Sequence, residues 1–542
     1  MRKNIFVVWA TMFCLGTMCQ AQDISIQFNG TKAKVKQAVK DSVSVEVDGA
    51  HVSIISTYQT HKLTIAMSGK SDDGQLILKT AGKAKLKLRG LELTSQEGAP
   101  IWLKNKKKVE VVATDGTKNT LTIAACNDTA NHKAATIWAK DKIKFSGKGT
   151  LNVLATGDGC KGIRSKDDIT IEELTLNVTT TGNNLGEKAN PFGEGFGAGA
   201  PPMGGFGGAG EGNDSTRQGG FGGFGGGRPP FNLDDLSEEE KARIEEMRKN
   251  FEEMMKNGGG FPMGGFGGQR PEGNDSTRQG GFGGFQMGGF GAPPSGEGEE
   301  GGGMPFGKHK YNGTCKGIKS DGQIIVNSGT VSVKTSSPGA EGIEGKEGVI
   351  LNDGQVTVNA VDDAINANAA IEFNGAQVVA ISTSNDAVDA NLAGAFFMPF
   401  GGGNQNQQQD PAIIITAGTV FAWSQVGAPE EGLDCDFSPI AISGGRVFSV
   451  GAGMGEMPSV PTNYTAKQPT ALLIGIDIAE NQPVQLYDDK GKLIDTFTVP
   501  FSLRRSASLL SNPLFKMGET YTVKTKGYEK TFTLNENFII VR

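Results

Sequence analysis

The residues Asp363-Ala364-Ile365-Asn366-Ala367 decide the fold class, because variants of this pentad recur along the chain. The second residue of each copy is Gly or Ala, the third is aliphatic and the fifth is small. The starting positions from the second copy to the fifth (316, 341, 363 and 386) are 25, 22 and 23 residues apart. The pentads occupy residues 161–165, 316–320, 341–345, 363–367, 386–390 and 431–435. A period of this size indicates a solenoid built from stacked repeats.

Short alternating stretches follow the pentads, for example residues 323–326 and 329–333, where every second side chain is aliphatic. Alternation of period two, interrupted by Gly and Asn, indicates strands and turns. A coil of about 23 residues with two or three short strands is typical of a parallel β-helix. We therefore predict an all-β fold, a right-handed parallel β-helix. A leucine-rich repeat has an overlapping period, but it requires a dense leucine pattern where this chain carries Ile and Val.

The same rhythm continues towards the N-terminus, where residues 101–103 and 137–139 resemble the third to fifth pentad positions. We predict that the β-helix comprises residues 22–182 and 311–464. A small β-region follows at residues 465–542, where further alternating stretches occur.

Residues 183–310 are dominated by glycine, with Phe, Met and Pro between the glycines. Such a stretch has too few side chains to offset its ordering entropy, so we expect a disordered insertion. One helix is predicted within it at residues 234–256, because Ser237 and Glu240 form a capping box before a helix-favouring sequence. The insertion is either a flexible loop or a tether that binds a partner.

Residues 1–21 predict an export signal. Arg2 and Lys3 precede an apolar run at residues 5–18 that is too short to span a bilayer, and cleavage is expected after Ala21. A lipoprotein anchored through Cys19 is the alternative. We expect a secreted or cell-surface protein, or a periplasmic one, without a transmembrane segment. The formal net charge of -6 and the absence of an aromatic-rich RNA signature argue against nucleic acid as a partner.

The fourth residue of each pentad follows an inward-facing aliphatic residue, so its side chain should point outwards. This column changes along the chain from aromatic to basic to acidic, and the first position follows the same trend. The fourth positions are Trp102, Trp138, Arg164, Lys319, Glu344, Asn366, Asp389 and Asp434. The first positions are Lys161, Lys316, Glu341, Asp363, Asp386 and Glu431.

The acidic coils predict a calcium site. Carboxylates stacked about 5 Å apart repel one another by about 1 kcal/mol in water, so a run of them requires a cation. Carboxylate and amide oxygens are hard ligands that suit Ca²⁺. The predicted ligands are Glu341, Glu344, Asp362, Asp363, Asn366, Asp386, Asp389, Glu431 and Asp434. The alternative is a solvated acidic edge without metal.

The basic and aromatic coils predict a carbohydrate site. Basic side chains could pair with sugar carboxylates, and indole rings could offer apolar faces to sugar rings. The predicted residues are Trp102, Trp138, Lys161, Arg164, Lys316 and Lys319. The alternatives are packing under a loop for the tryptophans and a solvated face for the basic residues.

Cys160 and Cys315 precede the first two pentads at equivalent positions. Stacked coils would bring their Cα atoms within disulfide range, so they form either a bridge or two stacked free thiols.

Further motifs at residues 98–102, 114–122 and 518–523 accompany the pentads and the late stretch 431–435. Together they resemble a family of secreted bacterial carbohydrate-binding-domain-containing parallel β-helix proteins that are distantly similar to pectate lyases. The resemblance implies a calcium-containing β-helix that binds acidic plant-type polysaccharide or cellulose. The chain departs from the family pattern in two ways: lysine begins the first two pentads instead of an acidic residue, and tryptophan replaces tyrosine.

Three functions follow from these observations. The first is a polysaccharide-binding protein with no catalytic residues. The second is a polysaccharide lyase with Arg164 or Lys319 as base. An exposed lysine has a pKa of about 10.4, so it is protonated at neutral pH and cannot accept a proton. The third is a surface adhesin or matrix protein in which the β-helix is a stiff spacer.

Overall fold

The computed structural model describes residues 22–126, 132–187, 311–392, 410–435, 438–451 and 459–542. The predicted export signal, residues 188–310 of the insertion and the predicted helix at 234–256 lie outside these residues. The chain divides into two compact units, residues 1–198 with 305–542 and residues 199–304, and all described residues belong to the first.

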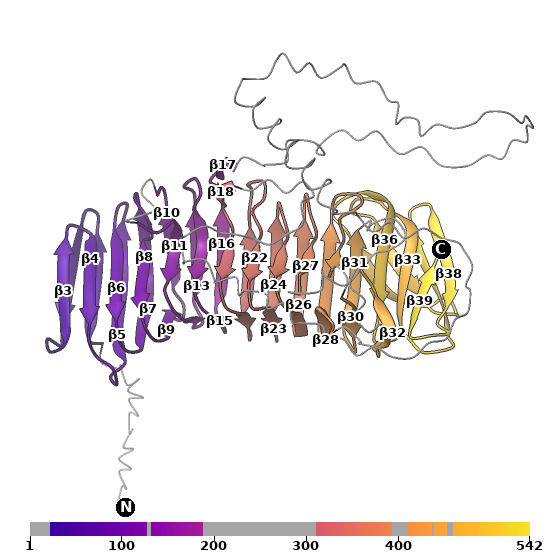
Figure 1. The fold of residues 1–542 in the computed structure, drawn as a ribbon, viewed down its shortest axis with the longest axis horizontal. Helices are drawn as coiled ribbons and strands as arrows, with labels where there is room; N and C mark the ends of the chain where they lie inside the picture. Colours follow the sequence, from indigo (N-terminus) through magenta and orange to yellow (C-terminus); the bar gives the residue numbers. More distant parts are fainter. Residues whose placement is uncertain (1–21, 127–131, 188–310, 393–409, 436–437, 452–458) are drawn as a thin grey trace, which may run out of the picture. The chain divides into compact units, whose positions relative to one another are not determined.

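The described residues form strands and no helix, which confirms the all-β class (Figure 1). Accordingly, this part of the chain contains no helix with the length and hydropathy that a membrane crossing requires. The pentads lie in an 11-stranded sheet, which we call the pentad sheet. Its strands, in spatial order, are β3 (Val43–Asp48), β4 (His51–Ser56), β6 (Gln75–Thr80), β8 (Ile101–Asn105), β11 (Ala135–Ala139), β14 (Lys161–Ser165), β19 (Ile318–Ser320), β22 (Ile343–Gly345), β25 (Ile365–Ala367), β27 (Val388–Ala390) and β29 (Leu433–Asp434).

The alternating stretches that follow each pentad strand form strands of a second sheet, which has 22 strands. Its strands from the coils are β1 (Ile24–Asn29), β2 (Lys32–Gln37), β5 (Leu63–Ser71), β7 (Ala84–Ser95), β9 (Val109–Ala113), β10 (Lys118–Ile123), β12 (Ile143–Ser146), β13 (Thr150–Ala155), β15 (Ile169–Ile171), β16 (Thr175–Thr180), β20 (Ile324–Val326), β21 (Thr330–Lys334), β23 (Val349–Leu351), β24 (Gln355–Ala360), β26 (Ile371–Ser382), β28 (Ile413–Ser424), β30 (Ile440–Ile442) and β31 (Arg446–Gly451). Nearly all pairs between neighbouring coils are parallel, for example β16 with β21 and β21 with β24. Stacked parallel coils are the arrangement of a parallel β-helix, and the right-handed sense stays a prediction.

The third pentad residues form a buried ladder, in which Ile318 pairs with Ile343 and Ile343 pairs with Ile365. The second pentad position lies against the opposite sheet. A Cβ atom added to Gly317 would lie 2.3 Å from Cγ1 of Val333 and 2.6 Å from a backbone oxygen. This coil therefore requires glycine at the second pentad position, and the other copies also carry a small residue there, either glycine or alanine.

The chain leaves the β-helix for the insertion between β14 and β19. Strand β17 (Leu185–Glu187) lies at the start of the predicted insertion (residues 183–310), β18 (Tyr311–Gly313) directly follows the insertion, and the two strands pair in antiparallel orientation. Across this junction β14 still pairs with β19, with Ile163 opposite Ile318. The coils on the two sides of the insertion therefore stack directly on each other.

The strands beyond β31 depart from the parallel pattern. Strands β32 (Pro461–Ala466), β33 (Thr470–Ile478), β36 (Leu503–Ser511) and β39 (Phe538–Val541) extend the large sheet, while β34 (Pro483–Tyr487), β35 (Leu493–Thr498), β37 (Thr520–Thr525) and β38 (Tyr528–Thr533) form an antiparallel sheet of four. A separate hydrophobic cluster fills this region, with Phe448 and Phe497 stacked 4.5 Å apart at its centre.

Candidate functional site

The pentad sheet aligns the fourth pentad positions in one column, as predicted from the repeat. Trp102 pairs with Trp138, Trp138 with Arg164 and Arg164 with Lys319. The column continues through Glu344, Asn366 and Asp389 to Asp434. The alignment of this column is therefore confirmed, while the binding roles of its members stay predictions.

Most of the polar part of this column is buried, so the alternative of a solvated face does not hold there. Lys319 is 2% exposed, Asp389 is 3% exposed and Asp363, in the first-position column, is 1% exposed. Charged groups at this depth lose their hydration and require partners. The side chains of neighbouring coils supply those partners, because a strand spacing of about 4.8 Å lets them reach across.

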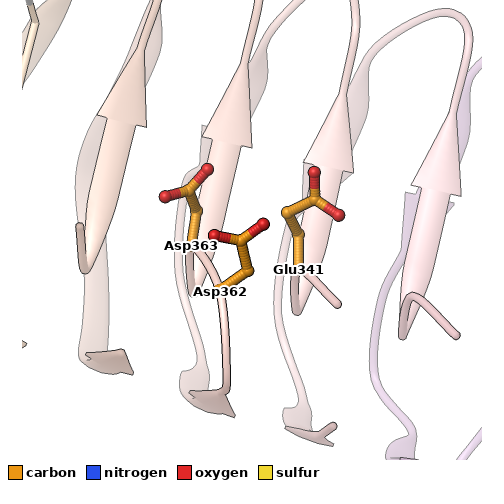
Figure 2. Close-up of side chains that lie close together, drawn as sticks. All are labelled: Glu341, Asp362 and Asp363. Atoms are coloured by element: carbon orange, nitrogen blue, oxygen red, sulfur yellow. The ribbon is translucent and has the colours of Figure 1, made fainter. Parts of the chain in front are cut away.

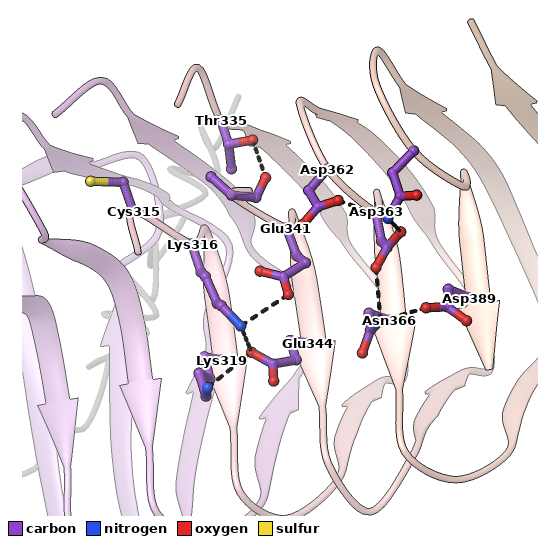
Figure 3. Close-up of polar contacts among 12 residues, drawn as sticks. Cys315, Lys316, Lys319, Thr335, Glu341, Glu344, Asp362, Asp363, Asn366 and Asp389 are labelled. Atoms are coloured by element: carbon purple, nitrogen blue, oxygen red, sulfur yellow. Dashed lines mark hydrogen bonds and ion pairs between the residues drawn. The ribbon is translucent and has the colours of Figure 1, made fainter. Parts of the chain in front are cut away.

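The basic and acidic coils meet in a cluster of ion pairs (Figure 3). The Lys316 Nζ atom lies 3.0 Å from Glu341 Oε1 and 2.6 Å from Glu344 Oε2, and the Lys319 Nζ atom lies 3.2 Å from Glu344 Oε2. Burial alone would raise the pKa of Glu344, but the two lysines outweigh it and hold that pKa at about 2. Glu344, predicted as a metal ligand, is thus charged and held by two lysines.

Arg164 is also paired within the protein. It donates to Asp321 over 2.7 Å, and Lys346 lies 3.3 Å from the same carboxylate. Arg164, Lys316 and Lys319 therefore already contact protein carboxylates, although they were predicted to bind acidic sugar. Lys161, the fourth basic residue of that prediction, is buried.

Three carboxylates come together where the first acidic coils meet (Figure 2). Glu341, Asp362 and Asp363 each offer one oxygen, and these oxygens lie within 4.8 Å of one another. Burial, together with Glu344 and Asp362, raises the pKa of Glu341 although Lys316 opposes it. Its second oxygen, Oε2, is buried and accepts no hydrogen bond from the described residues. We call Glu341, Asp362 and Asp363 the carboxylate cluster.

Two asparagines hold these acidic side chains in place. Asn385 donates to Asp362 over 2.8 Å and to Asp363 over 2.6 Å. Asn366 donates to Asp363 over 2.9 Å and to Asp389 over 3.0 Å (Figure 3). Each amide therefore bridges two carboxylates that would otherwise repel.

The remaining predicted ligands lie on the following coils. Burial raises the pKa of Asp386 well above its usual range, and the carboxylates of Asp434, Asp363 and Asp389 add to this. Burial and Asp434 raise the pKa of Glu431 to about 8. Glu431 accepts a hydrogen bond from the Ser459 backbone N–H over 2.8 Å, and Asp434 accepts one from the Ser459 hydroxyl over 2.8 Å. Buried carboxyl groups close to one another thus occur not only in the carboxylate cluster but also on the coils that follow it.

The two tryptophans at the other end of the column lie edge to face. Their ring centroids are 6.4 Å apart and the ring planes meet at 89°. The Lys104 Nζ atom lies 3.7 Å above the Trp102 ring, and Lys133 lies 5.5 Å from the Trp138 ring. The two rings therefore do not lie in one plane, and lysine ammonium groups lie over them, while their role in binding sugar stays a prediction.

Cys160 and Cys315 are free thiols in this structure, and both are buried. Burial, followed by the neighbouring Cys126 and Cys315, raises the pKa of Cys160 to about 12. A thiol with this pKa is protonated at neutral pH, so it is a weak nucleophile.

Sequence reasoning missed Asp321, Asn385 and Lys104. Asp321 directly follows a pentad and Lys104 occupies the corresponding place after Trp102 and Leu103, so the sixth position of the repeat held a usable signal. Asn385 precedes its pentad by one residue, as Asp362 does. The repeat could have revealed all three if the positions beside the pentad had also been aligned.

Comparison with known proteins identifies a family that this chain resembles. Residues 48–190 and 304–390 match the model of a family described as carbohydrate-binding domain-containing protein. A protein of the same description from Acetivibrio thermocellus is 32% identical over 156 residues, which cover 28% of this chain and 51% of that protein. This chain thus spans about half the length of that relative.

A solved structure, described as the polysaccharide lyase-like protein from C. thermocellum in a gadolinium derivative, covers 67% of this chain and 91% of its own. The TM-score is 0.36 and the sequence identity is 17%. The family match includes the tryptophan pair and the carboxylate cluster. The resemblance carried by the pentads is thereby confirmed: residues 48–190 and 304–390 match the carbohydrate-binding domain-containing family.

Proposed function

We propose that this is a secreted, calcium-dependent carbohydrate-binding protein rather than an enzyme, and that its ligand is an acidic, polygalacturonate-like or a cellulosic polysaccharide. The family match supports carbohydrate binding. The export signal expected at residues 1–21 supports secretion to the medium or the cell surface. The observation that carries the calcium dependence is the carboxylate cluster of Glu341, Asp362 and Asp363.

The residues of the cluster fit calcium by their chemistry. All three donors are carboxylates, which are the hard oxygen ligands that Ca²⁺ takes. Glu341 Oε2 is buried and lacks a hydrogen-bond donor among the described residues, so a cation would satisfy it. Glu341 Oε1 faces Lys316, which leaves the other oxygen for a ligand on the opposite side.

Calcium, when bound, supplies a positive charge and further coordination positions that sugar oxygens can fill. The protein's own residues prepare the site. Asn385 and Asn366 orient Asp362 and Asp363, and Lys316 fixes the orientation of Glu341. This arrangement limits the rearrangement that binding requires, which favours affinity.

Calorimetric titration of the chelated full-length protein with calcium, with and without polygalacturonate, tests the proposal. We expect calcium to bind and to strengthen polysaccharide binding. Asp362→Asn removes one charge from the cluster and should weaken calcium binding at least about tenfold, because one ligand of a site is worth about 1.4 kcal/mol or more.

Asp353→Asn is the matched control, because Asp353 is an exposed carboxylate outside the cluster whose short hydrogen bond to a backbone N–H an asparagine can retain. Its calcium affinity should equal that of the unmodified protein. If calcium does not bind at all, or if both variants behave alike, the cluster is not a calcium site and the proposed calcium dependence is wrong.

A further inference from the structure

A row of lysines crosses the N-terminal part of the pentad sheet. Lys79 on β6 pairs with Lys104 on β8. Ala139 at the end of β11 pairs with Leu103, so Lys140 continues the row on the next coil, and its backbone N–H donates to Leu103 O. Successive members of this lysine row (Lys79, Lys104 and Lys140) are therefore about one strand spacing apart, ~4.8 Å at the backbone.

The protein does not neutralise this row. Among the described residues, no carboxylate lies within ion-pair distance of Lys79, Lys104 or Lys140, whereas Arg164, Lys316 and Lys319 are all paired. Lys79 and Lys140 are exposed and Lys104 is half-buried. Burial, followed by the nearby charges of Lys79 and Lys133, lowers the pKa of Lys104, as expected of a cation among cations. Like charges held this close favour the arrival of an anion.

The tryptophan pair borders the row. Trp102 lies two residues before Lys104 on β8, on the same outward face, and Trp138 lies two residues before Lys140, which directly follows β11. The Trp102 ring holds one member of the row, because Lys104 Nζ lies 3.7 Å from the ring centroid. The Trp102 indole N–H finds no acceptor among the described residues. This N–H is buried, so the ammonium groups of the row are what a ligand meets, and a ligand that carries anionic groups would satisfy them.

We propose that the lysine row, with Trp102 and Trp138, is a second binding surface, which takes an acidic polysaccharide without calcium. The polysaccharide would run across the strands, so that successive sugar carboxylates meet successive lysines. This inference rests on the proposed function only in taking a polysaccharide as the ligand. The acidic coils further along the same sheet and the net charge of -6 disfavour a nucleic acid, which would bring a longer array of negative charge.

The test measures binding of the full-length protein to polygalacturonate in excess chelator. We expect binding that weakens as salt rises from about 0.05 M to about 0.3 M, because the contacts are exposed and screened. The triple variant K79Q/K104Q/K140Q should bind at least about tenfold more weakly, with each exposed charge contact contributing a factor of a few. The fully methyl-esterified polymer, which has the same backbone without charge, should bind weakly to both proteins.

The matched control is K32Q/K34Q/K36Q, which removes three exposed lysines from β2 and the same total charge. It should bind polygalacturonate like the unmodified protein, and both variants should keep the unmodified thermal unfolding midpoint. An equal loss of affinity for polygalacturonate in the two variants would mean that only the net charge of the protein matters, and would overturn the inference.

Binding only in the presence of calcium, with no effect of the lysine substitutions, would overturn this inference and leave the calcium-dependent function intact. Chelator-resistant binding that only the triple variant weakens would support the inference even if the carboxylate cluster proves not to bind calcium. Tighter binding of single-stranded DNA than of polygalacturonate through the same lysines would overturn the assignment to polysaccharide.

Discussion

Replacing Glu344 with glutamine should expose how much the ion pairs between the basic and acidic coils stabilise the fold. The substitution keeps the shape of the side chain and removes its charge. Lys319, whose side chain is 3% exposed, then loses the carboxylate that lies 3.2 Å away, while Lys316 keeps Glu341. A buried ammonium that loses a counter-ion is costly, because that contact no longer offsets the lost hydration.

Two arguments give a similar magnitude. Removing one partner of a buried ion pair typically costs about 3–5 kcal/mol, and the retained Lys316–Glu341 pair places this case near the lower end. The pKa of Glu344, lowered from 4.5 to about 2 despite burial, corresponds to about 3 kcal/mol in favour of its charged form. We therefore expect Glu344→Gln to lower the free energy of unfolding by about 3 kcal/mol.

Urea unfolding at neutral pH, followed by tryptophan fluorescence and by circular dichroism, measures this loss. Glu92→Gln is the control, because Glu92 pairs with Lys70 on the surface and both side chains are more than half exposed. That substitution should cost less than about 0.5 kcal/mol. A loss below about 1 kcal/mol for Glu344→Gln, similar to the control, would mean that water reaches the lysines and that the cluster is not buried in solution.

Three further predictions concern the coil, the pH dependence and catalysis. Gly317→Ala should destabilise the protein by about 1–3 kcal/mol in urea unfolding, because its Cβ would overlap a valine methyl group, while Gly427→Ala, which has open space, should cost little. Burial would raise the pKa of Glu110, but Lys62 and Lys85 lower it to about 2. Its contribution of about 1–2 kcal/mol is therefore present above pH 4.5 and is lost as the pH falls towards 2, and urea midpoints across this range should fall less steeply in Glu110→Gln. Incubation with polygalacturonate should release no unsaturated, ultraviolet-absorbing product, whereas steady release would identify a lyase.

The pentads were sufficient to predict the all-β class and the alignment of the outward column. A nearly constant repeat length places equivalent residues on neighbouring coils, so register follows from counting, as the pairing of Lys319 with Glu344 illustrates. The repeat also indicated where aliphatic ladders would form. These are properties of the backbone, and local sequence spacing determines them.

Burial and pairing could not be predicted in this way. Arg164 and Asp321 are 157 residues apart in the chain and meet only because the coils on the two sides of the insertion stack directly. Lysine and glutamate side chains are long enough to reach the next coil, so a column of single positions does not show that Lys316 contacts both Glu341 and Glu344. The alternative of a solvated face, which the sequence left open, does not hold for this reason.

Because β17 and β18 pair with each other at the two ends of the insertion, the stacking of the coils does not depend on the length of the insertion. Leu185 pairs with Gly313 and Glu187 with Tyr311, so the two ends of the inserted segment are held beside each other whatever lies between them. The entropy of closing such a loop grows only slowly with its length, by about 0.6 kcal/mol for each doubling. This position should therefore tolerate insertions and deletions: duplication, deletion or replacement of the inserted sequence should leave the coils unchanged. A foreign domain inserted there should likewise leave the β-helix intact.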